Sequence, residues 1–431
     1  MVTSSTPSQR SAQSTPSFVG PFITLTALYF IFGFITNLNM QLVPHLKSVF
    51  LDLSNMQAAL ATGVFFTAYL VCASPTSWLI DTIGYKKTMV VALFIQVAGA
   101  LLFLPAASLP NFWLFLAAAF IVGAGVAALQ TAANPYVSAL GPESSAPFRQ
   151  TLAQAFNSIG ATVAPLVGSA LILRHRVVMD AATLASKTAE EQAAYRVSVA
   201  STVRVPYLVI ACVLVVLGIA VSFAHLPVIR ATAKSSDAPS NESIWSYRHT
   251  VLATLGIFLY VGVEVGLANF MSSGYFGLPE LGGLTAAAAA GLTAYYWGGA
   301  LIGRLLGSAV LSRVNAGLLL GLFGALAAVS VIVSICTTGH VAIWSMLLCG
   351  FFNSIMFPCI FALGIAGLGP MTSKGSGLIM TAVFGGAVIP VVIGSLIDHM
   401  GFRMAAILPI LCYLYIAFYG FVGHKPTKTA V

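Results

Sequence analysis

The residues with the clearest capacity for chemistry are amides inside long apolar runs. Gln130 and Asn134 are four residues apart and share one helix face, and Gln154, Asn157 and Ser158 share another at spacings of three and four. Similar polar or aromatic residues recur in four other apolar runs: Asn37, Asn39 and Gln41; Asn269; Tyr295, Tyr296 and Trp297; and Asn353. Amides both donate and accept hydrogen bonds, which suits a ligand with several hydroxyl groups.

Two interpretations of these amides are open. Each one could simply bond helix to helix, which contributes about 0.6 to 2 kcal/mol in a membrane. As a set with almost no charge, they favour a neutral polyhydroxylated ligand such as a sugar, whose apolar face an aromatic ring can cover. An anionic substrate would need an Arg or Lys deep in a span. We expect none there, because Arg304 is assigned to the inner loops.

Glu264 is the one carboxylate that lies well inside an apolar run. Such an acid is a functional candidate, either as a proton carrier or as a hydrogen-bond acceptor for sugar, although a structural bond to a neighbouring helix would also explain it. Asp81 lies at an inner helix end beside Lys86 and Lys87, which favours a gate or a helix cap. Asp398, close to Arg403, favours a surface ion pair over a coupling group.

The elements that must position these residues are membrane-spanning helices. The chain has 431 residues, of which 58% are hydrophobic and 7% charged, and its mean hydropathy is +0.95. Continuous apolar runs of this kind predict an all-α integral membrane protein. We expect twelve spans, near residues 21–45, 56–79, 88–107, 110–139, 149–173, 205–227, 250–275, 284–310, 315–336, 341–366, 375–397 and 403–422.

Other classes of protein fit the composition less well. The six cysteines lie in apolar segments without CxxC spacing, so neither a disulfide nor a metal site is expected. The net charge of +8 is scattered over loops, which argues against nucleic acid as a partner. No arrangement of nucleophile, histidine and acid indicates an enzyme or a cofactor.

Charge and repetition predict the organisation of the chain. Basic residues are more frequent on the inner side when both termini are cytoplasmic, as the positive-inside rule requires. The segment "GATVAPLVGSALI" from Gly160 resembles "GAVIPVVIGSLI" from Gly386, 226 residues later. We therefore expect a cytoplasmic tail (1–20), a six-helix half (21–227), a cytoplasmic linker (228–249), a second six-helix half (250–422) and a short cytoplasmic tail (423–431). Paired halves around a midplane site are typical of secondary transporters.

With these residues in view, the chain resembles the major facilitator superfamily. The segment "SWLIDTIGYKK" is similar to that superfamily's loop motif G-x-x-x-D-x-x-G-x-K/R-K/R, with Ser77 in place of the first glycine. Segments 130–160 and 352–369 resemble the fucose, glucose and galactose permease branch, closest to its glucose/galactose members. The resemblance implies twelve helices in two pseudo-symmetric six-helix bundles, a central sugar site and proton-coupled uptake across a bacterial inner membrane. The predicted gating residues are Asp81, Gly84, Lys86 and Lys87, with Arg313 as their counterpart in the second half.

The resemblance also implies residue roles. Gln130 favours the glucose/galactose members, since the fucose permeases have a glutamate there. Gln154 and Asn157 match positions tied to sugar binding, and Glu264 and Asn353 match the glucose/galactose pattern. The predicted sugar site comprises Asn37, Asn39, Gln130, Asn134, Gln154, Asn157, Glu264, Asn269, Tyr296, Trp297 and Asn353. We expect a monomer in the inner membrane with a small neutral sugar as substrate.

One position departs from the family pattern. Met40 stands where the family has an aspartate to which proton coupling is usually attributed. Two hypotheses follow: facilitated diffusion without coupling, or coupling moved to Glu264 with H⁺ or Na⁺ as the ion. A sugar sensor and a drug exporter of the same fold are the remaining alternatives.

Overall fold

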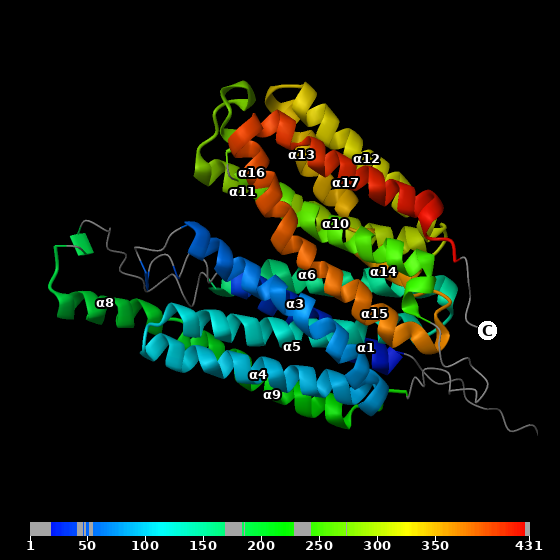
Figure 1. Ribbon diagram of the computed structural model, residues 1–431, viewed down its shortest axis with the longest axis horizontal. Helices are drawn as coiled ribbons and strands as arrows, with labels where there is room; N and C mark the ends of the chain where they lie inside the picture. Colours follow the sequence, from blue (N-terminus) through cyan, green and yellow to red (C-terminus); the bar gives the residue numbers. More distant parts are fainter. Residues whose placement is uncertain are drawn as a thin grey trace, which may run out of the picture.

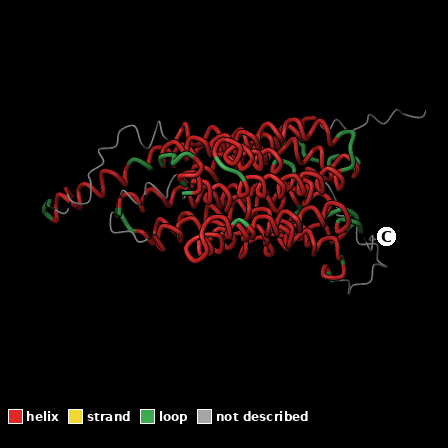
Figure 2. The backbone as a smooth tube through the Cα atoms, turned by 90° about the horizontal axis from the view of Figure 1, so that it is seen from above, coloured by secondary structure: helices red, strands yellow, loops and turns green. Residues whose placement is uncertain are grey.

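The described part of the chain is a bundle of helices that run roughly along one long axis (Figures 1 and 2). The computed structural model describes residues 19–40, 46, 49–50, 55–168, 183–184, 186–227, 243–272 and 274–426, and these residues contain no strand. The fold class expected from the sequence is confirmed. Nine helices among the described residues are long and apolar enough to cross a bilayer.

The first half of the chain supplies six of the expected spans. They are α1 (Val19–Met40), α3 (Asn55–Ile83), α4 (Tyr85–Ser108), α5 (Phe112–Ala139), α6 (Ala146–Gly168) and α9 (Arg204–Phe223). The polar segment before α9 contains one further helix, α8 (Ala189–Ser201), which starts with a capping box between Thr188 and Glu191. Most of the predicted N-terminal tail and linker, the side chains of Asn39 and Met40, and all of Gln41 lie outside the described residues.

The second half supplies the remaining spans, three of them in pieces. They are α10 (Arg248–Ser272), α11 (Ala286–Leu311), α12 (Ala316–Cys336), α13 (Gly339–Asn353) with α14 (Met356–Gly364), α15 (Thr372–Thr381) with η7 (Ala382–Phe384) and α16 (Gly385–Ala405), and α17 (Ile407–Phe418) with η8 (Tyr419–Gly423). The predicted span 341–366 is therefore interrupted directly after Asn353, which leaves backbone carbonyls there without a helical partner.

The two halves approach each other at one end of the molecule and diverge towards the other (Figure 1). The start of α1 and the C-terminus lie at the first end, which we call the terminal end. We call the opposite end, where α8 lies, the α8 end. Between the halves, α3 packs against α15 and α6 packs against α11 and α14. Polar groups on α6 and α11 are thus brought to the boundary between the halves, where α5 also packs against α15.

Close helix approach depends on glycine at specific positions. A Cβ on Gly160 of α6 would lie 2.1 Å from the carbonyl oxygen of Phe30 on α1, and one on Gly350 would lie 2.0 Å from that of Tyr296. In a bilayer such close backbone contact supplies much of the packing energy between helices. Gly84 has a different role, since its φ of 83° forms the turn between α3 and α4 inside the predicted gating motif.

Candidate functional site

A pair of opposite charges lies inside the second half. Arg304 on α11 places Nη2 3.6 Å from Oε1 of Glu264 on α10, and the two side chains are 11% and 13% exposed. The expectation that no basic residue lies deep in a span was wrong. Arg304 belongs to α11, which continues to Leu311, and the basic residue in the following loop is Arg313. Glu264 is therefore a neutralised acid rather than an isolated one.

Two tyrosines and an amide hold Glu264 in place. The hydroxyl of Tyr260 donates to Oε1 of Glu264 at 2.6 Å, and the hydroxyl of Tyr296 donates to its backbone carbonyl at 3.0 Å. Asn353 Nδ2 donates to the Tyr296 hydroxyl at 2.6 Å, and both residues are 0% exposed. Tyr296 and Asn353 thus form a buried chain of hydrogen bonds that ends at the backbone of Glu264, and neither side chain is accessible to a ligand. Tyr260 was missed by sequence reasoning, although its i, i+4 spacing to Glu264 could have indicated it.

Arg304 also reaches the first half of the molecule. Its Nε donates to the carbonyl of Ser354 at 3.3 Å, at the interruption between α13 and α14, and its Nη1 donates to the hydroxyl of Ser158 on α6. The neighbouring Gly303 makes this position possible, because a Cβ there would lie 2.4 Å from Oγ of Ser354. Ser158 was singled out from the sequence as part of a polar face, but its contact with a cation was not.

In the first half, two of the predicted amides are engaged in structural hydrogen bonds. Gln130 Nε2 donates to the hydroxyl of Tyr69 at 2.8 Å. Asn134 is 0% exposed and accepts from the hydroxyl of Tyr29, which also lies 3.1 Å from Oε1 of Gln150. Both amides therefore act at least as links between helices. Gln150 was missed, although it lies four residues before Gln154 on the same helix face.

Other predicted site residues remain freer to bind a ligand. Gln154 makes no side-chain hydrogen bond within the described part of the chain, and the same holds for Asn269, which is exposed. Asn37 donates to the carbonyl of Gly33 in its own helix at 3.2 Å, and Asn157 donates to the carbonyl of Tyr29 at a long 3.4 Å. The exposed fraction of Trp297 is 42%. They come from α1, α6, α10 and α11, of which α6 and α11 pack against each other across the boundary between the halves.

The predicted gating residues lie at the terminal end. Oδ1 of Asp81 accepts from the hydroxyl of Ser373 at 2.5 Å, in the first turn of α15, where the helix dipole favours a carboxylate. Two further bonds join the halves there: Gly367 N to Glu143 Oε1 at 2.8 Å, and the Ser376 hydroxyl to a carbonyl of α5 at 2.8 Å. The basic members of the motif (Lys86, Lys87 and Arg313) make no ion pair in the described residues.

The expected ion pair of Asp398 is absent from the described part of the chain. Arg403 instead places Nη2 3.1 Å from Oε1 of Glu280, in a turn that leads to α11. Asp398 thus stays exposed without a charged partner, because Glu280, distant in sequence, lies nearer to the guanidinium.

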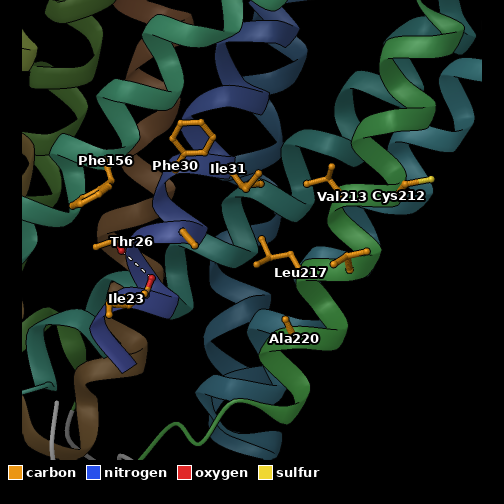
Figure 3. Close-up of a pocket in the computed structure, with 11 residues that line it drawn as sticks. Ile23, Thr26, Phe30, Ile31, Phe156, Cys212, Val213, Leu217 and Ala220 are labelled. Carbon is orange, nitrogen blue, oxygen red and sulfur yellow. Dashed lines mark hydrogen bonds between the residues drawn. The ribbon is translucent and has the colours of Figure 1, made fainter. Parts of the chain in front are cut away.

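A large apolar groove has none of the predicted site residues in its lining. It has a volume of about 700 Å³ and runs between α1, α6 and α9, with Phe30, Phe156 and Val213 among its walls (Figure 3). Its lining contains none of the predicted amides and no charged side chain. A polar substrate has no hydrogen-bond partner there beyond Thr26, whose hydroxyl already donates to the carbonyl of Ile23 at 2.8 Å.

Comparison with known proteins gives consistent matches over almost the whole chain. The family model described as Major Facilitator Superfamily matches residues 25–390. The glucose/galactose transporter of Brucella abortus biovar 1 (strain 9-941) is 44% identical over 402 residues, which is 93% of each chain. The L-fucose-proton symporter of Escherichia coli (strain K12) is 33% identical over 417 residues, 94% of each chain. A crystal structure of the transporter FucP in the outward conformation has a TM-score of 0.84 at 33% identity and covers 94% of this chain and 99% of that one.

Proposed function

The chain belongs to the Major Facilitator Superfamily, and from this premise we propose that it is a secondary transporter that moves a neutral hexose, such as glucose or galactose, across the bacterial inner membrane. The observation that carries this proposal is that helices of both halves hold uncharged amides, while the acid and the base inside the second half, Glu264 and Arg304, neutralise each other. A neutral ligand with many hydroxyl groups suits such a set of side chains. The name of the relative from Brucella abortus supports a hexose.

The transport cycle is alternating access between two six-helix halves, 21–227 and 250–422, joined by the linker 228–249. The hydrogen bonds between the halves at the terminal end support a form that is closed at this end and open towards the α8 end. The likeness to FucP in its outward conformation supports the same form. Basic residues predominate at the terminal end, which favours a cytoplasmic location for both termini. The transporter acts as a monomer.

Sugar counterflow tests the substrate class. Purified protein is reconstituted into liposomes loaded with unlabelled galactose, and entry of labelled galactose is measured. We expect transient accumulation that competing glucose abolishes, with fucose and N-acetylglucosamine compared in the same series. Failure of every sugar to exchange, together with efflux of lipophilic cations, would instead favour a drug exporter.

Coupling is a separate part of the proposal. Met40 occupies the position of the family's aspartate, so Glu264 is the remaining acid deep in the helices that can change its charge state. We propose that Glu264 carries the coupling ion. Galactose uptake should make the medium alkaline with wild-type protein and should not do so with Glu264→Gln, while counterflow persists in both. An equal response to a sodium gradient at constant pH would identify Na⁺ instead, and dependence on neither gradient would indicate facilitated diffusion.

A further inference from the structure

The side chain of Arg304 contacts three other helical segments, which belong to both halves of the molecule. Its guanidinium contacts the carboxylate of Glu264 on α10, the carbonyl of Ser354 between α13 and α14, and the hydroxyl of Ser158 on α6. We propose that Arg304 is a positioning residue that couples the state of Glu264 to the contact between the halves: held by Glu264, it binds Ser158 and keeps the halves together. This inference rests on the transport cycle proposed above.

The geometry gives each contact of the guanidinium a different role. Arginine presents its donors in a rigid planar fork, so its orientation is fixed once two of them are engaged. Here two acceptors, Glu264 and Ser354, belong to the second half, and Ser158 is the acceptor on the first half. The carbonyl of Ser354 is available because the helix is interrupted at this point. With two acceptors fixed in the second half, Nη1 of Arg304 points across the boundary to Ser158.

The charges explain why Glu264 would control this contact. The side chain of Arg304 is 11% exposed. The groups that face Glu264 are the hydroxyl of Tyr260, the guanidinium of Arg304 and the hydroxyl of Tyr296, which donates to the backbone carbonyl of Glu264. A buried ion that loses its partner is strongly destabilised. Once a proton or a sugar hydroxyl engages the carboxylate, the guanidinium turns towards water and releases Ser158. The halves then separate at this level, which opens the terminal end.

The first test removes the contact across the boundary and leaves the ion pair intact. After replacement of the native cysteines, spin labels are placed at Thr82 and Ser312, exposed residues at the terminal end of each half. Electron resonance distances are then measured without sugar. Ser158→Ala should raise the population with the longer distance by about tenfold, the effect of losing one hydrogen bond to a charged group. Thr162→Ala is the matched control, because this hydroxyl on the same helix bonds only to its own backbone.

The second test asks whether Glu264 acts through Arg304. Glu264→Gln should lengthen the distance as Ser158→Ala does, and the double variant should add nothing to the larger single effect, because both changes break one chain of contacts. Arg304→Lys keeps a positive charge beside Glu264 and so preserves the fold, but it lacks the fork and should also lengthen the distance. Additive effects, or wild-type distances in Ser158→Ala, would overturn the proposal.

The two proposals fail in different ways. The distances are measured in the absence of sugar, so they report on Arg304 whether or not galactose is the substrate. If the wild-type protein exchanges no sugar, the proposed function is overturned. The distances between the spin labels would still test the role of Arg304. Sugar exchange with distances that Ser158→Ala and Glu264→Gln leave unchanged would overturn only the role of Arg304.

Discussion

At the scale of single residues, the amides inside the helices fall into two groups according to what their side chains already bind. Asn134 and Asn353 are completely buried and hydrogen-bonded to tyrosines. Gln154 and Asn269 make no side-chain hydrogen bonds in the described part of the chain. An amide that is buried and bonded to a neighbouring helix stabilises the fold, whereas an amide without a side-chain partner gains most from a hydroxyl group of a ligand.

This division predicts opposite effects of two similar substitutions. Gln154→Ala should weaken galactose binding by about tenfold, the loss of one hydrogen bond to a ligand, with little change in melting temperature. Asn134→Ala should lower stability by about 1 to 3 kcal/mol, because it leaves the buried Tyr29 hydroxyl with a poorer set of partners. Thermal-shift measurements with and without galactose separate the two effects. Equal loss of stability in both variants would contradict the division.

Met40 allows a direct gain-of-function experiment. Met40→Asp restores the acid that the family pattern has at this position, so uptake of galactose into liposomes should become dependent on an inward pH gradient even when Glu264 is replaced by Gln. Met40→Asn supplies a polar control of the same size without a titratable group. If both variants respond to pH equally, the aspartate position does not carry the coupling ion in this chain.

At the scale of elements, close contact between helices depends on the absence of a side chain at particular glycines. The α1–α6 contact places Gly160 against the carbonyl of Phe30, and the α11–α13 contact places Gly350 against that of Tyr296. Both contacts lie next to functional candidates, since Tyr296 supports Glu264 and Gly160 is two residues after Ser158. Helix packing and site geometry are therefore linked.

A glycine substitution tests this link. Gly160→Ala should destabilise the protein by about 1 to 3 kcal/mol, because the new methyl group overlaps the Phe30 carbonyl and forces α1 and α6 apart. Gly63→Ala on α3 is the control, since a Cβ there meets nothing within 4 Å. Denaturation in detergent followed by circular dichroism measures both. A smaller effect at Gly160 than at Gly63 would show that the helices adjust without cost.

At the scale of the whole molecule, contacts at the terminal end hold the two halves together. The bond from Ser373 to Asp81 joins α3 to the start of α15, and Glu143 accepts from Gly367 nearby. In the proposed cycle, these contacts break each time the site changes sides. Their strength would then set the balance between the two proposed forms.

Removal of one of these contacts should shift that balance. Asp81→Ala eliminates both a hydrogen bond and a favourable interaction with the helix dipole, each contributing about 0.5 to 1 kcal/mol. The distance between spin labels at the terminal end should therefore lengthen in a larger fraction of molecules. Asp398→Ala is the matched control: it removes an exposed acid that lacks a charged partner in the described residues. An identical response of the two variants would exclude a gating role for Asp81.

The fold class, the approximate spans, the two related halves and the family could all be predicted from the sequence alone. These properties depend on hydrophobicity and local spacing, which each segment carries independently of its neighbours. The sequence also identified Glu264 as the acid of interest, because a carboxylate in an apolar run is conspicuous whatever surrounds it.

The side-chain contacts of Glu264, Arg304 and the amides depend on how the helices pack, so they became visible only in the tertiary structure. Arg304, assigned to a loop from its place in the chain, became the partner of Glu264 and Ser158 only when α11 packed against α10 and α6. In the same way, Asn134 and Asn353 proved to be bonded inside the protein, whereas the side chain of Gln154 makes no hydrogen bond in the described part of the chain. These contacts join residues tens of positions apart, up to 146 for Arg304 and Ser158, and no local pattern specifies which side chains will meet at such separations.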